Sequence, residues 1–101
     1  MNNLRIDPQG EGTYVVEGSL DFTSVPSFVT RAAEFLGNGA TLIVIDLKGV
    51  TRADSAGLAL LVEWIRMAHE RHRNISFRNI PAQMLAIAKV SGLERILPTA
   101  D

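Results

Sequence analysis

Apolar residues in two segments follow the spacing of β-strands. Thr13–Glu17 is rich in β-branched and aromatic residues and lies between glycines, and Ser19–Asp21 could extend it or pair with it. The run Leu42–Leu47 is apolar except for Asp46. Such a run is typical of a strand that is buried on both faces, in a sheet with helices packed against it. We therefore place Leu42–Leu47 at the centre of a sheet.

Two longer segments have the spacing of helices, with apolar residues recurring every three or four positions. The first begins at Ser24, a suitable N-cap, and ends at Gly37-Asn38-Gly39. The second should begin at Asp54 or Ser55 and run to about Arg71. Both helices lie next to the predicted strand Leu42–Leu47 in the chain, which fits a sheet with helices packed against it.

The last quarter of the chain repeats this order of strand and helix. Ile75–Arg78 alternates as a strand, and a third helix is opened by Asn79-Ile80-Pro81, with Asn79 as N-cap, and stopped by Gly92. Ile96–Leu97 is either a short last strand or a segment that closes the core. The pattern predicts an α/β sandwich with a small mixed sheet, and we expect residues 1–101 to form a single domain.

Length, charge and composition remove several classes of protein. The chain has 101 residues, the length of one domain, and its net charge of -1 gives no attraction for nucleic acid or for an anionic membrane. It has no cysteine, which excludes disulfides and thiolate metal sites. Residues Met1–Arg5 lack the features of a signal peptide, and no apolar run approaches the roughly 18 residues of a membrane span. We expect a soluble cytoplasmic protein.

The most informative chemical group is the hydroxyl of Ser55, which follows Asp54 at the start of the second helix. The N-terminus of a helix carries unpaired N–H groups and the positive end of the helix dipole. Ser55 could therefore cap the helix, carry a phosphate, or contact a partner. Asp54 is an equally good N-cap, so either residue could be present only to start the helix.

The second helix has an apolar arc wider than one sheet contact requires. Beside the stripe that faces the sheet lies a second stripe, which holds Leu60, Trp64 and Met67. Two interpretations stay open. Either the second stripe packs against the third helix, or Trp64 with Leu60 or Met67 belongs to a partner surface, because tryptophan is enriched at the energetic centres of interfaces. In the second case Ser55 lies on or beside that surface.

Basic side chains also surround Ser55 in the sequence. Lys48 and Arg52 flank the loop before it, and Arg66 lies on the same face of the helix. They are either ordinary surface charges or groups that pair with acids of a partner or with a phosphate on Ser55. The predicted partner interface therefore comprises Lys48, Arg52, Asp54, Ser55, Leu60, Trp64, Arg66 and Met67.

No arrangement of residues in the sequence indicates an enzyme. His69 and His72 lie three positions apart on a helix, but the spacing of zinc hydrolases and a third ligand are missing. Asp21, Asp46 and Asp54 could converge at one end of the sheet, yet no pocket or electrophile accompanies them. A serine-histidine-acid triad cannot be argued either. We predict no catalytic activity, no metal and no cofactor.

Three segments carry a resemblance to a known family. The stretch Ile45–Leu58 resembles the signature of the STAS domain, and the similarity extends to Glu17–Asp21 and to Val90–Leu97. The family includes anti-sigma factor antagonists and the soluble STAS subunit of bacterial lipid-asymmetry ABC transporters. The resemblance implies a STAS fold, with a small mixed sheet and helices packed mainly on one face.

The two branches of this family imply different partners. In the sigma-regulating branch, the residue at Ser55 is phosphorylated by a partner serine kinase. The continuation Gly57–Trp64 is more similar to the lipid-transport branch, which binds a cytoplasmic ATPase subunit. The resemblance therefore implies a non-enzymatic subunit that binds the ATPase of a phospholipid ABC transporter and meets the membrane only through that complex. The alternative is an anti-sigma factor antagonist regulated at Ser55.

Overall fold

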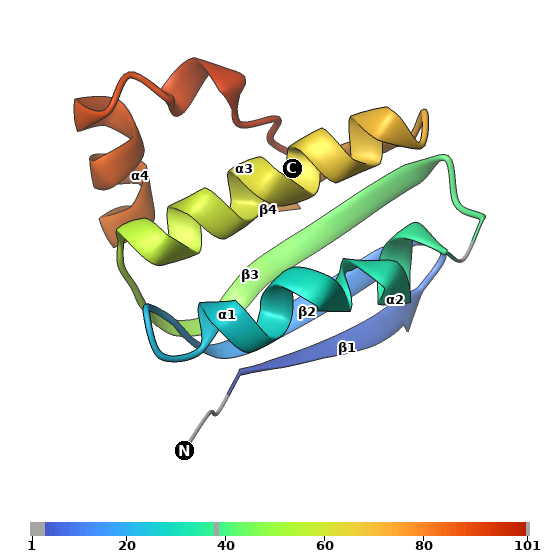
Figure 1. Cartoon of the computed structure of the whole chain (residues 1–101), viewed down its shortest axis with the longest axis horizontal. Coiled ribbons are helices and arrows are strands. Elements are labelled where there is room, and N and C mark those ends of the chain that lie inside the picture. Colours follow the sequence, from blue (N-terminus) through green and yellow to red (C-terminus); the bar gives the residue numbers. More distant parts are fainter. Residues whose placement is uncertain (1–3, 38, 101) are drawn as a thin grey trace.

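A mixed sheet of four strands underlies the whole structure (Figure 1). The structure, a computed structural model, describes residues 4–37 and 39–100. β1 pairs antiparallel with β2, whereas β2 with β3 and β3 with β4 pair in parallel. The two inner strands are β2 and β3, so the predicted central position of Leu42–Leu47 is confirmed. The strands are β1 (Arg5–Gly10), β2 (Thr13–Leu20), β3 (Leu42–Ala53) and β4 (Asn74–Arg78).

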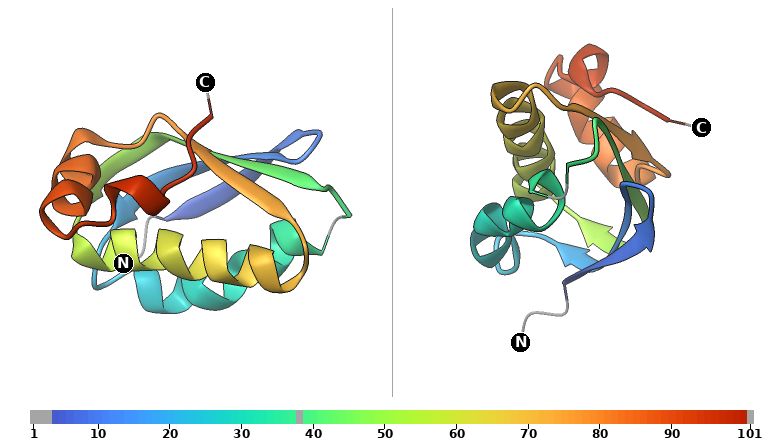
Figure 2. Two further views of the ribbon diagram at one scale, coloured as in Figure 1. Left: turned by 90° about the horizontal axis from the view of Figure 1, so that it is seen from above. Right: turned by 90° about the vertical axis from the view of Figure 1, so that its right-hand side faces the viewer.

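Helices follow from the two parallel pairings, because parallel neighbours need a crossover connection. Three of the helical segments connect β2 to β3, α3 connects β3 to β4, and α4 follows β4. Figure 2 shows α1, α2 and α3 side by side as one layer over one face of the sheet. This arrangement confirms the predicted fold class. The segments are α1 (Val25–Phe28), η1 (Val29–Ala32), α2 (Ala33–Leu36), α3 (Ser55–Glu70), α4 (Ala82–Val90) and the short 3₁₀ turn η2 (Glu94–Ile96).

The core lies between the sheet and the helical layer. Ile43, Ile45 and Leu47 of β3 alternate toward the helices, where they join the buried cluster. Val44 and Asp46, which alternate to the other face, are also buried. The strand is therefore buried on both faces, as its continuous apolar run predicts.

The first helix differs from its prediction because it is not continuous. Periodicity predicts one helix from Ser24, whereas the structure has α1, a 3₁₀ segment and α2 in succession. The 3₁₀ segment begins with Val29 and Thr30, whose branched side chains lower helix propensity. Ser24 stands at the N-cap position but its side chain makes no cap hydrogen bond there. The predicted stop includes Asn38, which lies outside the described residues.

The C-terminal third differs from its prediction at two points. Asn79 is not the N-cap of α4: it has φ +58°, and its side chain donates to Asp46 Oδ1 at 2.9 Å, so the helix begins after Pro81 instead. Ile96 ends η2 and is exposed, whereas Leu97 is buried. Leu97 therefore closes the core, and the bridge to β4 is made two residues later by Thr99.

The first turn of α3 approaches the end of β2 so closely that only glycine fits at position 57. A Cβ atom on Gly57 would lie 2.7 Å from the carbonyl oxygen of Leu20. We expect Gly57→Ala to destabilise the protein, because overpacking typically costs about 1–3 kcal/mol and the gain in helix propensity is at most about 1 kcal/mol.

Denaturant unfolding followed by circular dichroism measures this effect of Gly57→Ala. Ala59→Ser is the matched control, since Ala59 lies on the exposed side of the same helix. Equal stability of the two variants would contradict the close approach of α3 to β2.

Candidate functional site

The N-terminus of α3 is capped by Asp54, not by Ser55. Asp54 has the extended backbone of an N-cap residue, and its Oδ1 accepts a hydrogen bond from the Ala56 amide at 2.8 Å. Its other oxygen, Oδ2, accepts from the Phe22 amide at 3.3 Å. Ser55 is the first helical residue and is exposed. The capping role therefore belongs to Asp54, and the Ser55 side chain lies at the surface, open to a phosphate or a partner.

The loop between β2 and α1 lies directly beside this helix start, at the same end of the molecule in Figure 1. Asp21 Oδ1 accepts from the amides of Thr23 and Ser24 at 3.0 and 3.1 Å. The buried Ser24 hydroxyl donates to the Ser19 carbonyl at 2.5 Å. The loop is thus held by its own polar side chains.

The loop also carries a residue that sequence reasoning missed. The side chain of Phe22 is 74% exposed, although the backbone amide of the same residue is bound to Asp54. Helical or strand periodicity gives no reason to single out a phenylalanine between two elements. The available signal was chemical: an aromatic ring stands in a turn whose neighbours, Asp21 and Thr23, are polar.

Leu60 and Trp64 do not belong to an exposed surface. Leu60 is 1% and Trp64 0% exposed, so neither can contact a partner while the domain stays folded. Trp64 packs edge-on against Phe35 of α2, with ring centroids 5.1 Å apart. Their assignment to a partner interface is therefore corrected. The wide apolar arc has a structural cause, because α3 contacts the helical segments of the β2–β3 connection on one side and α4 on another.

The other predicted interface residues are spread along the molecule. Met67 is half-buried against the core. Arg66 is exposed but forms ion pairs with Glu63 and, at 2.6 Å, with Glu70 of its own helix. The hydrogen bond from Arg66 lowers the pKa of the Glu63 carboxyl. Arg66 also lies eleven positions after Ser55, about 16 Å along the helix axis, so the structure does not bring it to the Ser55 hydroxyl.

Of the three basic residues, Arg52 lies nearest to Ser55 in the chain. It is exposed near the end of β3, three positions before Ser55. Lys48 is also exposed, but lies six positions before Asp54 on an extended strand, about 20 Å away. The surface at the start of α3 therefore combines Arg52, Asp54 and Ser55 with Phe22. We keep the name helix-start surface for these four residues.

The remaining polar candidates are used by the fold itself. Asp21 precedes Phe22 in the chain, and Asp54 binds the Phe22 amide. Both carboxylates accept hydrogen bonds from backbone amides. Asp46 lies apart from them and accepts from the Lys48 amide and from Asn79, each at 2.9 Å. In residues 4–37 and 39–100, no group of three or more histidine or acidic side chains is placed to hold a metal ion. The same residues contain no helix that is long and apolar enough to cross a membrane.

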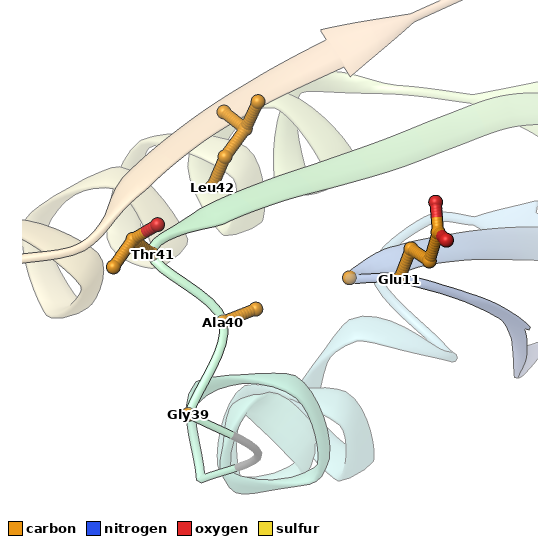
Figure 3. A pocket seen from close by; sticks show the side chains of 6 residues that line it. Glu11, Gly39, Ala40, Thr41 and Leu42 are labelled. Atoms are coloured by element: carbon orange, nitrogen blue, oxygen red, sulfur yellow. The ribbon is translucent and has the colours of Figure 1, made fainter.

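A hollow of the described surface lies at the other end of β3 from Ser55. It has a volume of about 590 Å³ and is lined by Glu11 and Gly12 of the β1–β2 hairpin and by Gly39–Leu42. Figure 3 shows Ala40 pointing toward the hairpin and Thr41 pointing away from it. Glu11 is the one charged residue in this lining, so the hollow offers no constellation for catalysis or phosphate binding.

Comparison with solved structures shows the same fold in regulatory proteins and in a transport complex. A chain of the Acinetobacter MlaFEDB complex in an ATP-bound conformation is 26% identical, with a TM-score of 0.74 over 87% of this chain and 93% of that one. An anti-sigma factor antagonist from Mycobacterium paratuberculosis is 18% identical, with a TM-score of 0.73 over 96% and 83%. The phosphorylated Bacillus cell fate determinant SpoIIAA is 20% identical, with a TM-score of 0.67 over 97% and 91%.

These observations place the chain first in a class and then in a family. It is a small mixed α/β domain whose candidate site presents side chains at a helix start. It belongs to the STAS family, since the family model described as "Mlab, STAS domain" matches residues 6–98. A search of curated proteins finds no sequence that matches.

Proposed function

We propose that this STAS domain is a non-enzymatic subunit that binds the cytoplasmic ATPase of a phospholipid ABC transporter and supports its assembly or activity. The observation that carries the proposal is the likeness to a chain of the MlaFEDB complex, at 26% identity over 93% of that chain. The identities to the anti-sigma factor antagonist and to SpoIIAA named above are 18% and 20%.

The geometry of the helix-start surface supports binding in preference to catalysis. Ser55 has no histidine beside it in the chain, and the nearest carboxylate, that of Asp54, is occupied by two backbone amides. A surface of this kind can dock onto another protein without any reacting group. In this proposal the protein works at the inner face of the inner membrane, held there by its partner.

Affinity purification of the tagged protein from its native cells tests the proposal. Mass spectrometry identifies the partners and reads the modification of Ser55. Recovery of an ABC ATPase together with its permease, with Ser55 unmodified, is the expected result. Recovery of a serine kinase together with phosphorylated Ser55 would overturn it.

The second candidate function is that of an anti-sigma factor antagonist. The exposed position of Ser55 at the start of α3 favours it, because a phosphate there gains from the helix dipole and adds about two negative charges beside Asp54. The likeness to the phosphorylated form of SpoIIAA supports the same idea. In that case the partner is a serine kinase, and the charge on Ser55 switches its binding.

Charge reversal tests whether the basic side chains steer the partner. We expect Arg52→Glu to slow association with the ATPase subunit at low salt by about 3- to 10-fold, because an exposed charge at the rim of an interface acts on the association rate. Lys48→Glu is the matched variant farther from Ser55 and should slow association less. Stopped-flow kinetics measures both rates, and unchanged rates at low salt would argue against steering.

A further inference from the structure

We propose that Phe22 is the anchor of the partner-binding surface: its ring enters an apolar pocket of the partner, and the Asp54 carboxylate holds it in position beside Ser55. This inference rests on the proposed function, because it concerns the same helix-start surface. It adds a contact residue, the chemistry of the partner's pocket, and a positioning role for Asp54.

The side chain of Phe22 is not part of the hydrophobic core of the domain. Its side chain is 74% exposed, whereas the other five aromatic residues of the chain are buried. A phenyl ring loses favourable burial when it stays in water. Large aromatic side chains that enter a pocket are among the groups that dominate binding energy at protein interfaces. The ring is therefore better explained by a partner than by the isolated domain.

The loop that carries the ring is ordered before any partner arrives. The Phe22 amide is bound to Asp54, and the next two amides are bound to Asp21. Ser24 is 3% exposed and ties the loop to the end of β2 through the Ser19 carbonyl. A side chain on such a loop loses little conformational entropy on binding, so more of its contact energy appears as affinity.

Asp54 links the ring to the serine through its two oxygens. Oδ1 accepts from Ala56 and caps the helix that begins with Ser55, while Oδ2 accepts from Phe22. Phe22 lies 32 positions before Asp54 in the chain, whereas Ala56 lies two positions after it. One carboxylate therefore fixes the loop and the helix start relative to each other.

The surroundings of the ring define the pocket that fits it. The carboxylates of Asp21 and Asp54 are already paired with backbone amides of this chain, so they need no cation from a partner. The group next to them, the Ser55 hydroxyl, is uncharged and exposed. Arg52, which is exposed on the same surface, adds a positive charge at its rim. The complementary surface is therefore an apolar pocket for one aromatic ring, with acidic groups at the part of its rim that faces Arg52.

Truncation of the ring tests the anchor. We expect Phe22→Ala to weaken binding to the purified ATPase subunit at least about 30-fold in calorimetric titration, the loss typical of an interface hot spot. The matched control is Val90→Ala, which removes an exposed apolar side chain at the end of α4. The control should change affinity less than about twofold. Both variants should keep the melting temperature of the parent chain.

Asp54→Asn tests the positioning role separately from the cap. Asparagine is as good an N-cap as aspartate, so the amide of Ala56 keeps its acceptor. The other arm becomes an NH₂ group, which cannot accept from the Phe22 amide. We expect hydrogen exchange at the Phe22 amide to quicken at least about tenfold while exchange at Ala56 stays slow, together with an affinity loss smaller than that of Phe22→Ala. Unchanged exchange at Phe22 would overturn the positioning role.

The outcomes separate the anchor from the function on which it rests. If the parent chain binds the ATPase subunit and Phe22→Ala binds equally well, the anchor is wrong and the proposed function stands. If the parent chain does not bind the ATPase subunit, the proposed function fails. The same two variants are then titrated against the serine kinase, where loss of binding for Phe22→Ala alone keeps the anchor. Equal binding of the two variants, or binding to neither protein, overturns it.

Discussion

Trp64→Ala is expected to lower the free energy of unfolding by about 3–5 kcal/mol, the usual cost of removing a large aromatic side chain from a core. Trp64 is fully buried in α3 and packs edge-on against Phe35, which in turn lies 5.6 Å from the ring of Tyr14. Its removal leaves a cavity at the contact of α3 with α2 and β2. Because a domain of this size has a total stability of about 5–15 kcal/mol, the variant should lose a large fraction of its stability.

Denaturant unfolding monitored by far-ultraviolet circular dichroism measures this loss for Trp64→Ala. Trp64→Phe is the matched control, because it keeps an aromatic ring and removes an indole N–H that is buried without a hydrogen-bond partner in residues 4–37 and 39–100. An unsatisfied buried donor is unfavourable, so the smaller ring should cost clearly less than alanine. Lost partner binding with little change in stability would contradict the core position and restore the interface interpretation.

The position of Trp64 shows how much of the structure the spacing of apolar residues can predict. The spacing in α3 predicted the helix, and its wide apolar arc predicted that something covers the second stripe. It could not say what, because the cover comes from Phe35, 29 positions earlier in the chain. Trp64 packs against Phe35 of α2, and α3 also contacts the third predicted helix, α4. An apolar arc defines which residues avoid water, whereas the neighbour depends on the tertiary fold.

The strand β1 is an element that the spacing of apolar residues did not predict. It was not predicted because Arg5–Gly10 contains Asp7, Pro8 and a terminal glycine, and only Ile6 of its six residues is buried. Proline and charged residues are typical of an edge strand, where one side of the backbone needs no partner. The pairing of β1 with β2 depends on the hairpin and on the burial of Leu4 and Ile6. A short edge strand therefore carries too little apolar periodicity to be found from sequence.

The candidate site was predicted in part for the same reason. The Asp54–Ser55 junction is local, so the sequence located the helix start and its capping residues. The contact between the Phe22 amide and Asp54 joins positions 32 apart, and no local pattern encodes it. Conversely, Arg66 shares a helical face with Ser55 but is separated from it by three turns and is paired with Glu63 and Glu70. A shared face is therefore not evidence of a shared site.

Ser55→Asp is expected to weaken partner binding at least about tenfold, a change of about 1.4 kcal/mol in binding free energy. The carboxylate would stand at an exposed position beside Asp54, where docking must either desolvate it or bring it near other charges. The same carboxylate lies in the first turn of α3, where the helix dipole favours a negative charge by about 0.3–1 kcal/mol. Folding stability should therefore stay constant or rise while affinity falls, a combination that damage to the fold cannot produce.

Calorimetric titration with the purified partner and a thermal melt of the same samples measure the two effects of Ser55→Asp. Ser91→Asp is the control, since Ser91 is exposed after the end of α4. Unchanged affinity for Ser55→Asp would remove the start of α3 from the partner surface. Ser55→Ala then separates the two functions. A transporter subunit that uses the hydroxyl only as a contact keeps most of its affinity, and its partner binding is not regulated by phosphorylation in either the parent chain or the variant. A sigma regulator keeps its affinity as well, but becomes unable to release its kinase, because the group that would receive the charge is gone.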